Sequence, residues 1–238
     1  MKSQLKLGEV VVDVVLKNIK NVHLSVYPPT GRVRISAPER MKIDTIRVFA
    51  ISKLDWIRQQ QEKLRQQERE TAREYVDRES LYVWGRRYLL AICESDEPPS
   101  VALKHSRILL RVRPGTVESK RKALVEEWYR EQLKKAVPSL VMKCQPRMGV
   151  TVERFFVQRM KTKWGSCNQK ARTIRLNTEL AKKPAECLEY IVVHELVHLL
   201  EPTHNLRFVS LMNRFMPKWQ FYREVLNRLP VRQETWDY

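Results

Sequence analysis

Residues 194–204 read HELVHLLEPTH and contain three of the chain's five histidines. A helix is predicted here, because Pro184 suits a first helical position and apolar residues recur at helical spacing after it. On a helix, His194 and His198 lie one turn apart and project from the same face. That spacing lets two imidazole nitrogens reach a single metal ion at ~2.0–2.1 Å.

A third ligand is predicted just after this helix. Pro202 keeps Glu201 away from helical dihedral angles and stops the helix, so the chain turns and His204 can return toward the pair. Three protein ligands with one open position are the arrangement of a catalytic zinc site. Glu201 itself, or Glu224 on a later helix, remains an alternative third ligand.

Glu195 lies about 100° around the helix from His194, beside the metal position without ligating the ion. Zinc lowers the pKa of a bound water from ~15.7 to about 7, and a nearby carboxylate can take its proton and pass it to the leaving group. The pattern therefore predicts a zinc hydrolase with Glu195 as general base. The alternative is that both helical histidines are ordinary hydrogen-bonded residues of a partly buried helix.

The composition points to a basic protein without a membrane segment. A formal net charge of +18 attracts polyanions such as DNA, or leaves a solvated basic surface. No apolar run approaches the ~20 residues that span a bilayer, and Glu9 and Asp13 interrupt what would be a signal peptide, so we expect a cytoplasmic protein. The four cysteines form no C-x-x-C pair, which argues against a cysteine zinc site.

Strand patterns dominate the first half of the chain and helical patterns the second, which predicts an α+β fold. An antiparallel β-unit is expected at 9–16, 22–27 and 32–36, followed by a helix that Asp44 caps and that continues as a polar connector. Four strand-like segments follow at 80–85, 87–92, 100–105 and 107–113. Further elements are expected as a helix near 117–137, strands at 150–157 and 173–176, and the zinc helix near 184–201.

We therefore predict two domains. Residues 1–75 form the β-unit with its connector helix, and residues 76–238 form a metallohydrolase domain. No internal repeat is evident in the sequence. The oligomeric state is not indicated.

From about Phe156 to Trp219 the sequence resembles the YgjP-like zinc metallopeptidase family, related to the SprT-like proteases, while the first half resembles it loosely. The resemblance rests on MKTKWGSCNQKARTIRLNTEL (160–180) and YIVVHELVHLLEPTHNLRFVSLMNRFMPKW (190–219). It implies a zincin-like (minigluzincin or SprT-like) catalytic domain with His194, His198 and His204 as zinc ligands. It also implies that the strand around Arg175 borders the cleft, where an extended peptide adds by strand pairing. SprT-like proteases act on DNA-bound proteins, so by analogy the substrate is associated with nucleic acid.

Other residues near this site allow two interpretations each. A basic cluster predicts either an anion-binding rim or a solvated face; its members are Arg154, Arg159, Lys161, Lys163, Lys170, Arg172 and Arg175. Tyr190 can steady an oxyanion or simply pack, and the Trp164–Cys167 loop can line the cleft or cap the core. Cys167 is not expected to be a nucleophile.

Three functions are therefore considered. The first is a zinc metallopeptidase acting on a protein or peptide. The second is a metal-dependent nucleoside triphosphate pyrophosphatase, in which basic side chains would stabilise phosphoryl charge. The third is a non-catalytic nucleic-acid-binding module with structural zinc, although such sites normally have four protein ligands. A groove over the metal fits a peptide, and a narrow pocket fits a nucleotide.

Overall fold

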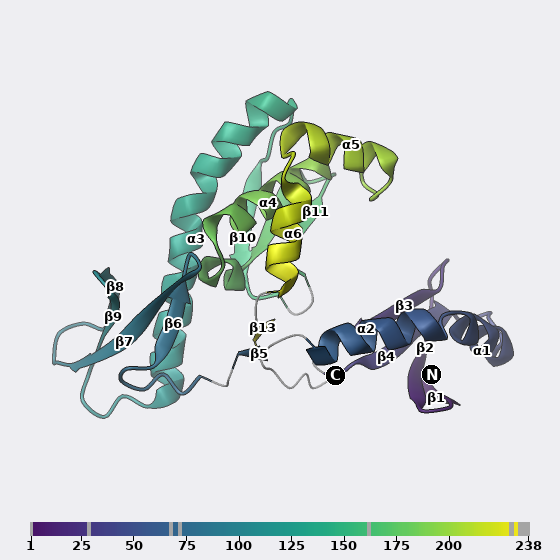
Figure 1. Ribbon diagram of the computed structural model, residues 1–238, viewed down its shortest axis with the longest axis horizontal. Helices are drawn as coiled ribbons and strands as arrows, with labels where there is room; N and C mark the ends of the chain where they lie inside the picture. The colour runs from purple at the N-terminus through teal and green to yellow at the C-terminus, as the bar shows by residue number, and fades with distance from the viewer. Residues whose placement is uncertain are drawn as a thin grey trace. The chain divides into compact units, whose positions relative to one another are not determined.

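The computed structural model describes residues 2–27, 30–66, 69–70, 73–160, 163–228 and 231–232. The chain folds as two compact units, residues 1–72 with 230–238 and residues 73–229. Each unit has a hydrophobic core of its own. The predicted α+β class is confirmed, with small sheets in the first half and most of the helices in the second (Figure 1). In the described residues, no helix is both long and apolar enough to cross a membrane.

The first unit is built on a mixed four-stranded sheet with the strand order β1-β2-β4-β3. Its strands are β1 (Lys2–Leu7), β2 (Val10–Lys17), β3 (His23–Tyr27) and β4 (Arg32–Pro38). Alternate residues Val10, Val12 and Val14 are buried, as expected for a sheet with one covered face. The expected antiparallel pairing holds for β3 with β4, but β2 and β4 are parallel. Strand β1, which was not predicted, pairs antiparallel with β2.

Two helices cover the buried face of this sheet where one long connector was predicted. Helix α1 (Ile43–Ser52) begins after Lys42, so Asp44 lies in its first turn and is not the cap. The helix breaks at Lys53, and α2 (Leu54–Gln66) follows. Of the expected continuation, residues 67–68 and 71–72 lie outside the described residues. The short strand β5 (Arg69–Glu70) pairs in parallel with β13 (Val231–Arg232).

The second unit starts with another mixed four-stranded sheet, with the order β6-β7-β9-β8. Its strands are β6 (Ser80–Val83), β7 (Arg86–Glu94), β8 (Ser100–Lys104) and β9 (Arg107–Val112). The two central strands are parallel and each edge strand is antiparallel to its neighbour, as in the first sheet. The chain therefore repeats one strand topology. The sequence does not reveal this repeat because the two sheets share alternation and pairing order, not a residue motif.

Helix α3 (Glu118–Met148) is longer than predicted, because it passes through Pro138 and Pro146 instead of ending near residue 137. Its buried face includes Val137, Val141 and Cys144 on either side of the first proline. Burial of this face offsets the hydrogen bond that a proline removes. The helix packs against β8 and β9 near its start and against β10 further along (Figure 1).

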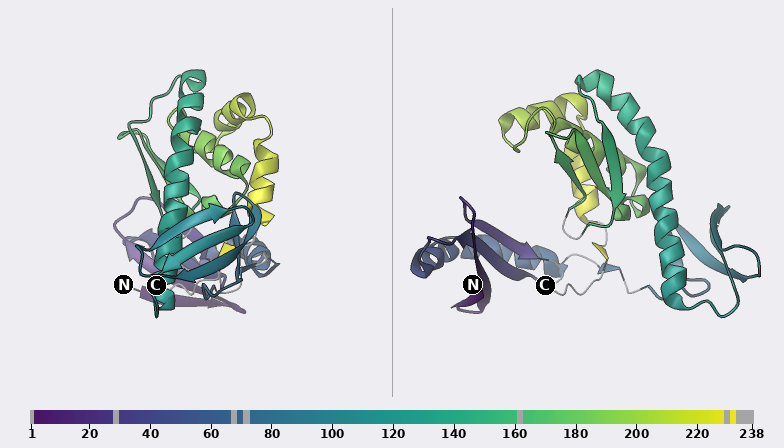
Figure 2. Two further views of the ribbon diagram at one scale, coloured as in Figure 1. Left: turned by 90° about the vertical axis from the view of Figure 1, so that its left-hand side faces the viewer. Right: turned by 180° about the vertical axis from the view of Figure 1, so that it is seen from behind.

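A three-stranded sheet with the order β10-β12-β11 follows α3. Its strands are β10 (Arg154–Gln158), β11 (Gly165–Asn168) and β12 (Thr173–Asn177). Most of the Trp164–Cys167 segment, predicted as a loop, is thus part of an edge strand. A 3₁₀ turn, η1 (Thr178–Lys182), leads into α4 (Ala185–Val197), which covers one face of this sheet with α5 (Leu206–Phe215) and α6 (Trp219–Arg228) packed on α4 (Figure 2).

The turn between β6 and β7 anchors the start of α4. The Trp84 amide donates to the Ala181 carbonyl at 2.9 Å, and the Gly85 amide donates to the Lys182 carbonyl at 3.2 Å. Gly85 has φ +78°, and a Cβ there would lie 2.9 Å from Cγ of Pro184. The first sheet of this unit therefore fixes the point from which the helix carrying the histidines begins.

The separate cores predict that a cavity in the first unit leaves the second unit intact. Ile35 is fully buried, so Ile35→Ala is expected to lower the free energy of unfolding of its unit by about 2–5 kcal/mol. Hydrogen exchange followed by mass spectrometry should show faster exchange in β2 and β4, with α4 unchanged. Val11→Ala, at a position 47% exposed on the same sheet, is the control. Equal acceleration in α4 would show that the two cores unfold together.

Candidate metal centre

The first two histidines come from the last turn of α4. The helix ends at Val197, earlier than predicted, and His198 is its C-cap with helical angles (φ −63°, ψ −19°). The His198 amide donates to the His194 carbonyl at 3.2 Å, so the predicted one-turn spacing is kept. Their ring centroids are 4.8 Å apart.

The turn that brings His204 back is held by side-chain hydrogen bonds. The Glu201 carboxylate accepts from the Thr203 amide at 3.2 Å and from its hydroxyl at 2.9 Å. Asn205 then caps α5 by accepting from the Phe208 amide at 3.0 Å. His204 lies between these two fixed points, and its Nε2 is 3.1 Å from Nε2 of His194.

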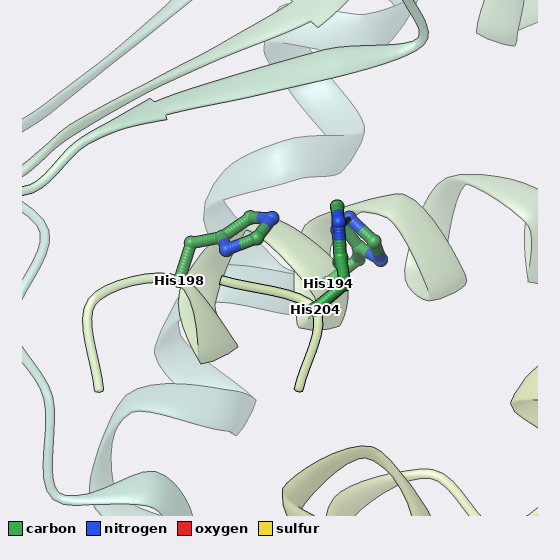
Figure 3. Close-up of side chains that lie close together, drawn as sticks. All are labelled: His194, His198 and His204. Carbon is green, nitrogen blue, oxygen red and sulfur yellow. Dashed lines mark hydrogen bonds between the residues drawn. The ribbon is translucent and has the colours of Figure 1, made fainter. Parts of the chain in front are cut away.

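The three imidazoles face one another across a small space (Figure 3). One ring nitrogen from each of His194, His198 and His204 lies within 4.8 Å of the others. Nδ1 of His198 is 3.1 Å from the Glu201 carbonyl, a bond that fixes the tautomer with a lone pair on Nε2. Nδ1 of His194 is buried without a hydrogen-bond partner among the described residues. The three ring nitrogens that face one another fit a zinc ion, which favours imidazole nitrogen as a ligand.

The alternative third ligands have other partners. The Glu201 carboxylate is occupied by Thr203, as described above. Glu224 is exposed on α6 and forms an ion pair with Arg228 at 3.5 Å. Within the described part of the chain, the histidine cluster contains neither carboxylate.

Phe208 on α5 forms an apolar floor under the cluster. Its ring centroid lies 5.0 Å from that of His194, 4.8 Å from that of His198 and 4.6 Å from that of His204. The side chain is only 2% exposed. No helical spacing in the sequence indicates this role, because His204 precedes the N-cap Asn205 and does not lie on the helix that carries Phe208.

Glu195 lies directly under the edge strand β11. A Cβ at Gly165 would be 2.5 Å from Oε1 of Glu195, so only glycine lets the strand approach this carboxylate. The Glu195 side chain is 4% exposed, and burial raises its pKa to about 8, with the Lys163 charge opposing the shift. Burial is also the first cause that lowers the pKa of His194 to about 3, ahead of the charges on His198 and His204. The Glu195 carboxylate and the His194 ring are thus poorly solvated, whereas His204 is exposed.

Asn177 positions the segment that enters β11, a role that was not predicted from the sequence. Its side-chain amide donates to the carbonyls of Met160 and Lys163, both at 2.9 Å, and its carbonyl oxygen accepts from the Glu179 amide at 3.2 Å. The Asn177 amide also donates to the Trp164 carbonyl at 2.9 Å. Asn177 is buried, so its polar atoms require these partners, but its burial is a tertiary property that the sequence does not show.

A cavity of about 840 Å³ contains the histidine cluster, Glu195 and Tyr190. Its wall includes residues 163–170, so the Trp164–Cys167 segment lines the cavity, and Trp164 also packs against the core. Tyr190 is 5% exposed and makes an edge contact with the His194 ring at 5.9 Å. Burial, aided by the Glu195 charge, raises the pKa of Cys167 to about 11, which keeps it a thiol at neutral pH.

The predicted basic cluster divides between this cavity and other surfaces. Lys163, Lys170 and Arg175 line the cavity. Arg154, Arg159 and Arg172 are not part of its wall, and Lys161 lies outside the described residues.

The expectation of peptide pairing at the strand around Arg175 is wrong. Arg175 does reach the cavity, but its strand β12 is central and already pairs with β10 and β11. The edge that borders the cavity belongs to β11.

The family model of the YgjP-like metallopeptidase domain matches residues 20–229. The chain belongs to the YgjP-like metallopeptidase family. The predicted family is thereby confirmed, and the match extends over most of the first half, which resembled it only loosely by sequence motifs. In this YgjP-like metallopeptidase, the three histidines and Glu195 all lie within the matched residues.

Two solved structures of metallopeptidase zymogens are similar to part of this YgjP-like chain. Abylysin of Pyrococcus abyssi is 23% identical with a TM-score of 0.35, covering 39% of this chain and 90% of its own. Jannalysin of Methanocaldococcus jannaschii is 21% identical with a TM-score of 0.34, covering 38% of this chain and 92% of its own. No curated protein matches the chain.

The convergence of the imidazoles predicts that His204 and not Glu224 is needed for tight metal binding. His204→Ala removes one of three nitrogens, so zinc per chain, measured by plasma mass spectrometry after dialysis, should fall from about one to a small fraction. Glu224→Ala removes an exposed ion pair and should retain full zinc content. The opposite result would assign the third ligand to Glu224.

The contact between β11 and Glu195 predicts a second effect. In Gly165→Ala the new methyl group displaces the Glu195 side chain, so cleavage of peptides should fall by about 100-fold. Zinc content should persist because the substitution does not touch a histidine. Gly115→Ala, at a turn with φ +73° where an added Cβ meets nothing within 4 Å, controls for the backbone strain of a glycine substitution without a side-chain clash. Unchanged cleavage by Gly165→Ala would show that the position of Glu195 is not critical.

Proposed function

We propose that the protein is a zinc-dependent peptidase with His194, His198 and His204 as ligands and Glu195 as general base. The observation that supports this most is the meeting of three ring nitrogens and a buried carboxylate in one cavity of a metallopeptidase-family chain. Zinc held by three imidazoles supplies a Lewis acid and an activated water.

The remaining steps belong to side chains of the protein. Glu195 would accept a proton from the water that attacks the peptide carbonyl, and would then deliver that proton to the leaving nitrogen when the peptide bond breaks. Packing under Gly165 limits the directions in which its carboxylate can turn. The Tyr190 hydroxyl, in the same cavity, is our candidate donor to the carbonyl oxygen of the bond that is cleaved.

An extended peptide is the substrate form that suits this cavity. One side of β11 pairs with β12, and in the described part of the chain no strand pairs with its other side. A substrate in the β conformation can satisfy those backbone groups by strand addition. This feature favours a polypeptide over a nucleoside triphosphate, which offers no strand backbone.

We further propose that nucleic-acid-associated proteins are a source of such polypeptides. The net charge of +18 supports association with DNA or another polyanion, and the resemblance to SprT-like proteases points the same way. A protein that meets DNA-bound substrates needs no membrane attachment, and we propose that it acts in the cytoplasm.

The assignment of Glu195 is tested by an isosteric substitution. Glu195→Gln cannot accept the proton, so cleavage of a broad quenched-fluorescent peptide library should fall by at least about 100-fold while zinc content stays unchanged. Glu189→Gln is the matched control, because Glu189 lies on the same helix and pairs with Lys143 outside the cavity wall. If the wild-type protein releases pyrophosphate from nucleotides and cleaves no peptide, the pyrophosphatase alternative replaces this proposal.

A further inference from the structure

Two cations of the cavity wall lie just beyond the two ends of β11, and a third lies on the neighbouring strand β12. Lys163 lies two residues before the strand and Lys170 two residues after it. Arg175, on β12, pairs in register with Ser166 in the middle of β11. We refer to Lys163, Lys170 and Arg175 as the cationic rim.

No exposed acidic side chain balances the cationic rim within the described cavity wall. The wall contains one carboxylate, that of Glu195, which is buried beneath Gly165. A cavity lined by charge of one sign concentrates its field on the ligand.

The position of Glu195 relates the cationic rim to the reacting bond. Because the carboxylate lies under Gly165, the bond it acts on lies near the start of β11, with Lys163 on one side along the strand and Lys170 on the other. A peptide paired with β11 would place alternate side chains on the face that carries Ser166 and Arg175. The rim therefore meets side chains on both sides of that bond.

We propose that the substrates are extended acidic segments of polypeptide, with Asp or Glu side chains on both sides of the cleaved bond. This inference rests on the proposed peptidase function. Nucleic acid would also be attracted by the cations, but the cations flank an unpaired strand edge, and that edge binds a peptide backbone. The combination of edge and charge selects an acidic peptide.

Peptides that differ only in flanking charge test the proposal. Three quenched-fluorescent peptides share an uncharged centre and carry Glu, Gln or Lys on both sides of it. One exposed ion pair typically changes an equilibrium by about twofold. Three such contacts should therefore favour the Glu peptide over the Gln peptide by about tenfold in kcat/KM. The Lys peptide should be the poorest, and the differences should shrink at high salt.

Binding to an inactive variant separates recognition from turnover. Fluorescence anisotropy of the three peptides, labelled with the fluorophore but without the quencher, should show that Glu195→Gln binds the Glu peptide most tightly, then the Gln peptide, then the Lys peptide. In the active protein, Lys170→Glu and Arg175→Glu should each lower the Glu-to-Lys ratio of kcat/KM by about fivefold or more. Arg154→Glu, exposed on the same sheet but outside the cavity wall, should leave the ratio unchanged, and melting temperatures should verify that every variant is folded.

The possible failures are distinguishable. Equal cleavage and equal binding of the three peptides would overturn the acidic preference and leave the peptidase assignment intact. If that equality came with strong inhibition by DNA that Lys170→Glu relieves, the cationic rim would bind nucleic acid instead. Ordered binding without cleavage of any peptide would uphold the acidic preference as recognition and remove the peptidase assignment.

Discussion

The turn at 201–204 is the constraint on which the metal centre depends, because it converts a helix with two histidines into a three-nitrogen cluster. Glu201 performs two tasks there. Its carboxylate holds Thr203, and its carbonyl lies 3.1 Å from Nδ1 of His198. One residue thereby fixes both the return of His204 and the tautomer of His198. Phe208 then packs against all three rings and helps to hold them together.

The sequence was sufficient for the parts of the site that depend on local geometry. Helical spacing placed His194 and His198 on one face, and Pro202 predicted the turn that follows. The roles of Gly165 and Asn177 could not be predicted in this way, because both act on residues distant in sequence. Strand β11 was missed for a related reason: Gly-Ser-Cys-Asn has weak strand propensity, and the strand exists through its pairing with β12.

The difference between local patterns and contacts distant in sequence also explains which parts of the fold were predicted. The strand-rich first half followed from alternation of apolar residues, which is local, whereas the parallel pairing of β2 with β4 and of β7 with β9 is a tertiary property. Helix α3 shows tertiary packing overriding a local rule. Pro138 would end an isolated helix, but the buried residues Val137 and Val141 keep the helix on the core across the proline.

The unpaired edge of β11 and the buried carboxylate of Glu195 are both unfavourable features that lie together at this site. An unpaired strand edge invites association with other chains, and a carboxylate with 4% exposure carries a desolvation penalty. Each feature alone lowers stability or solubility. Because Gly165 brings them into contact, a polypeptide bound to the edge lies above the group that transfers the proton. In a protein with net charge +18, the cations of Lys163 and Lys170 beside that edge oppose pairing with a basic strand of another copy, which is the same electrostatic effect that we propose for the selection of acidic substrates.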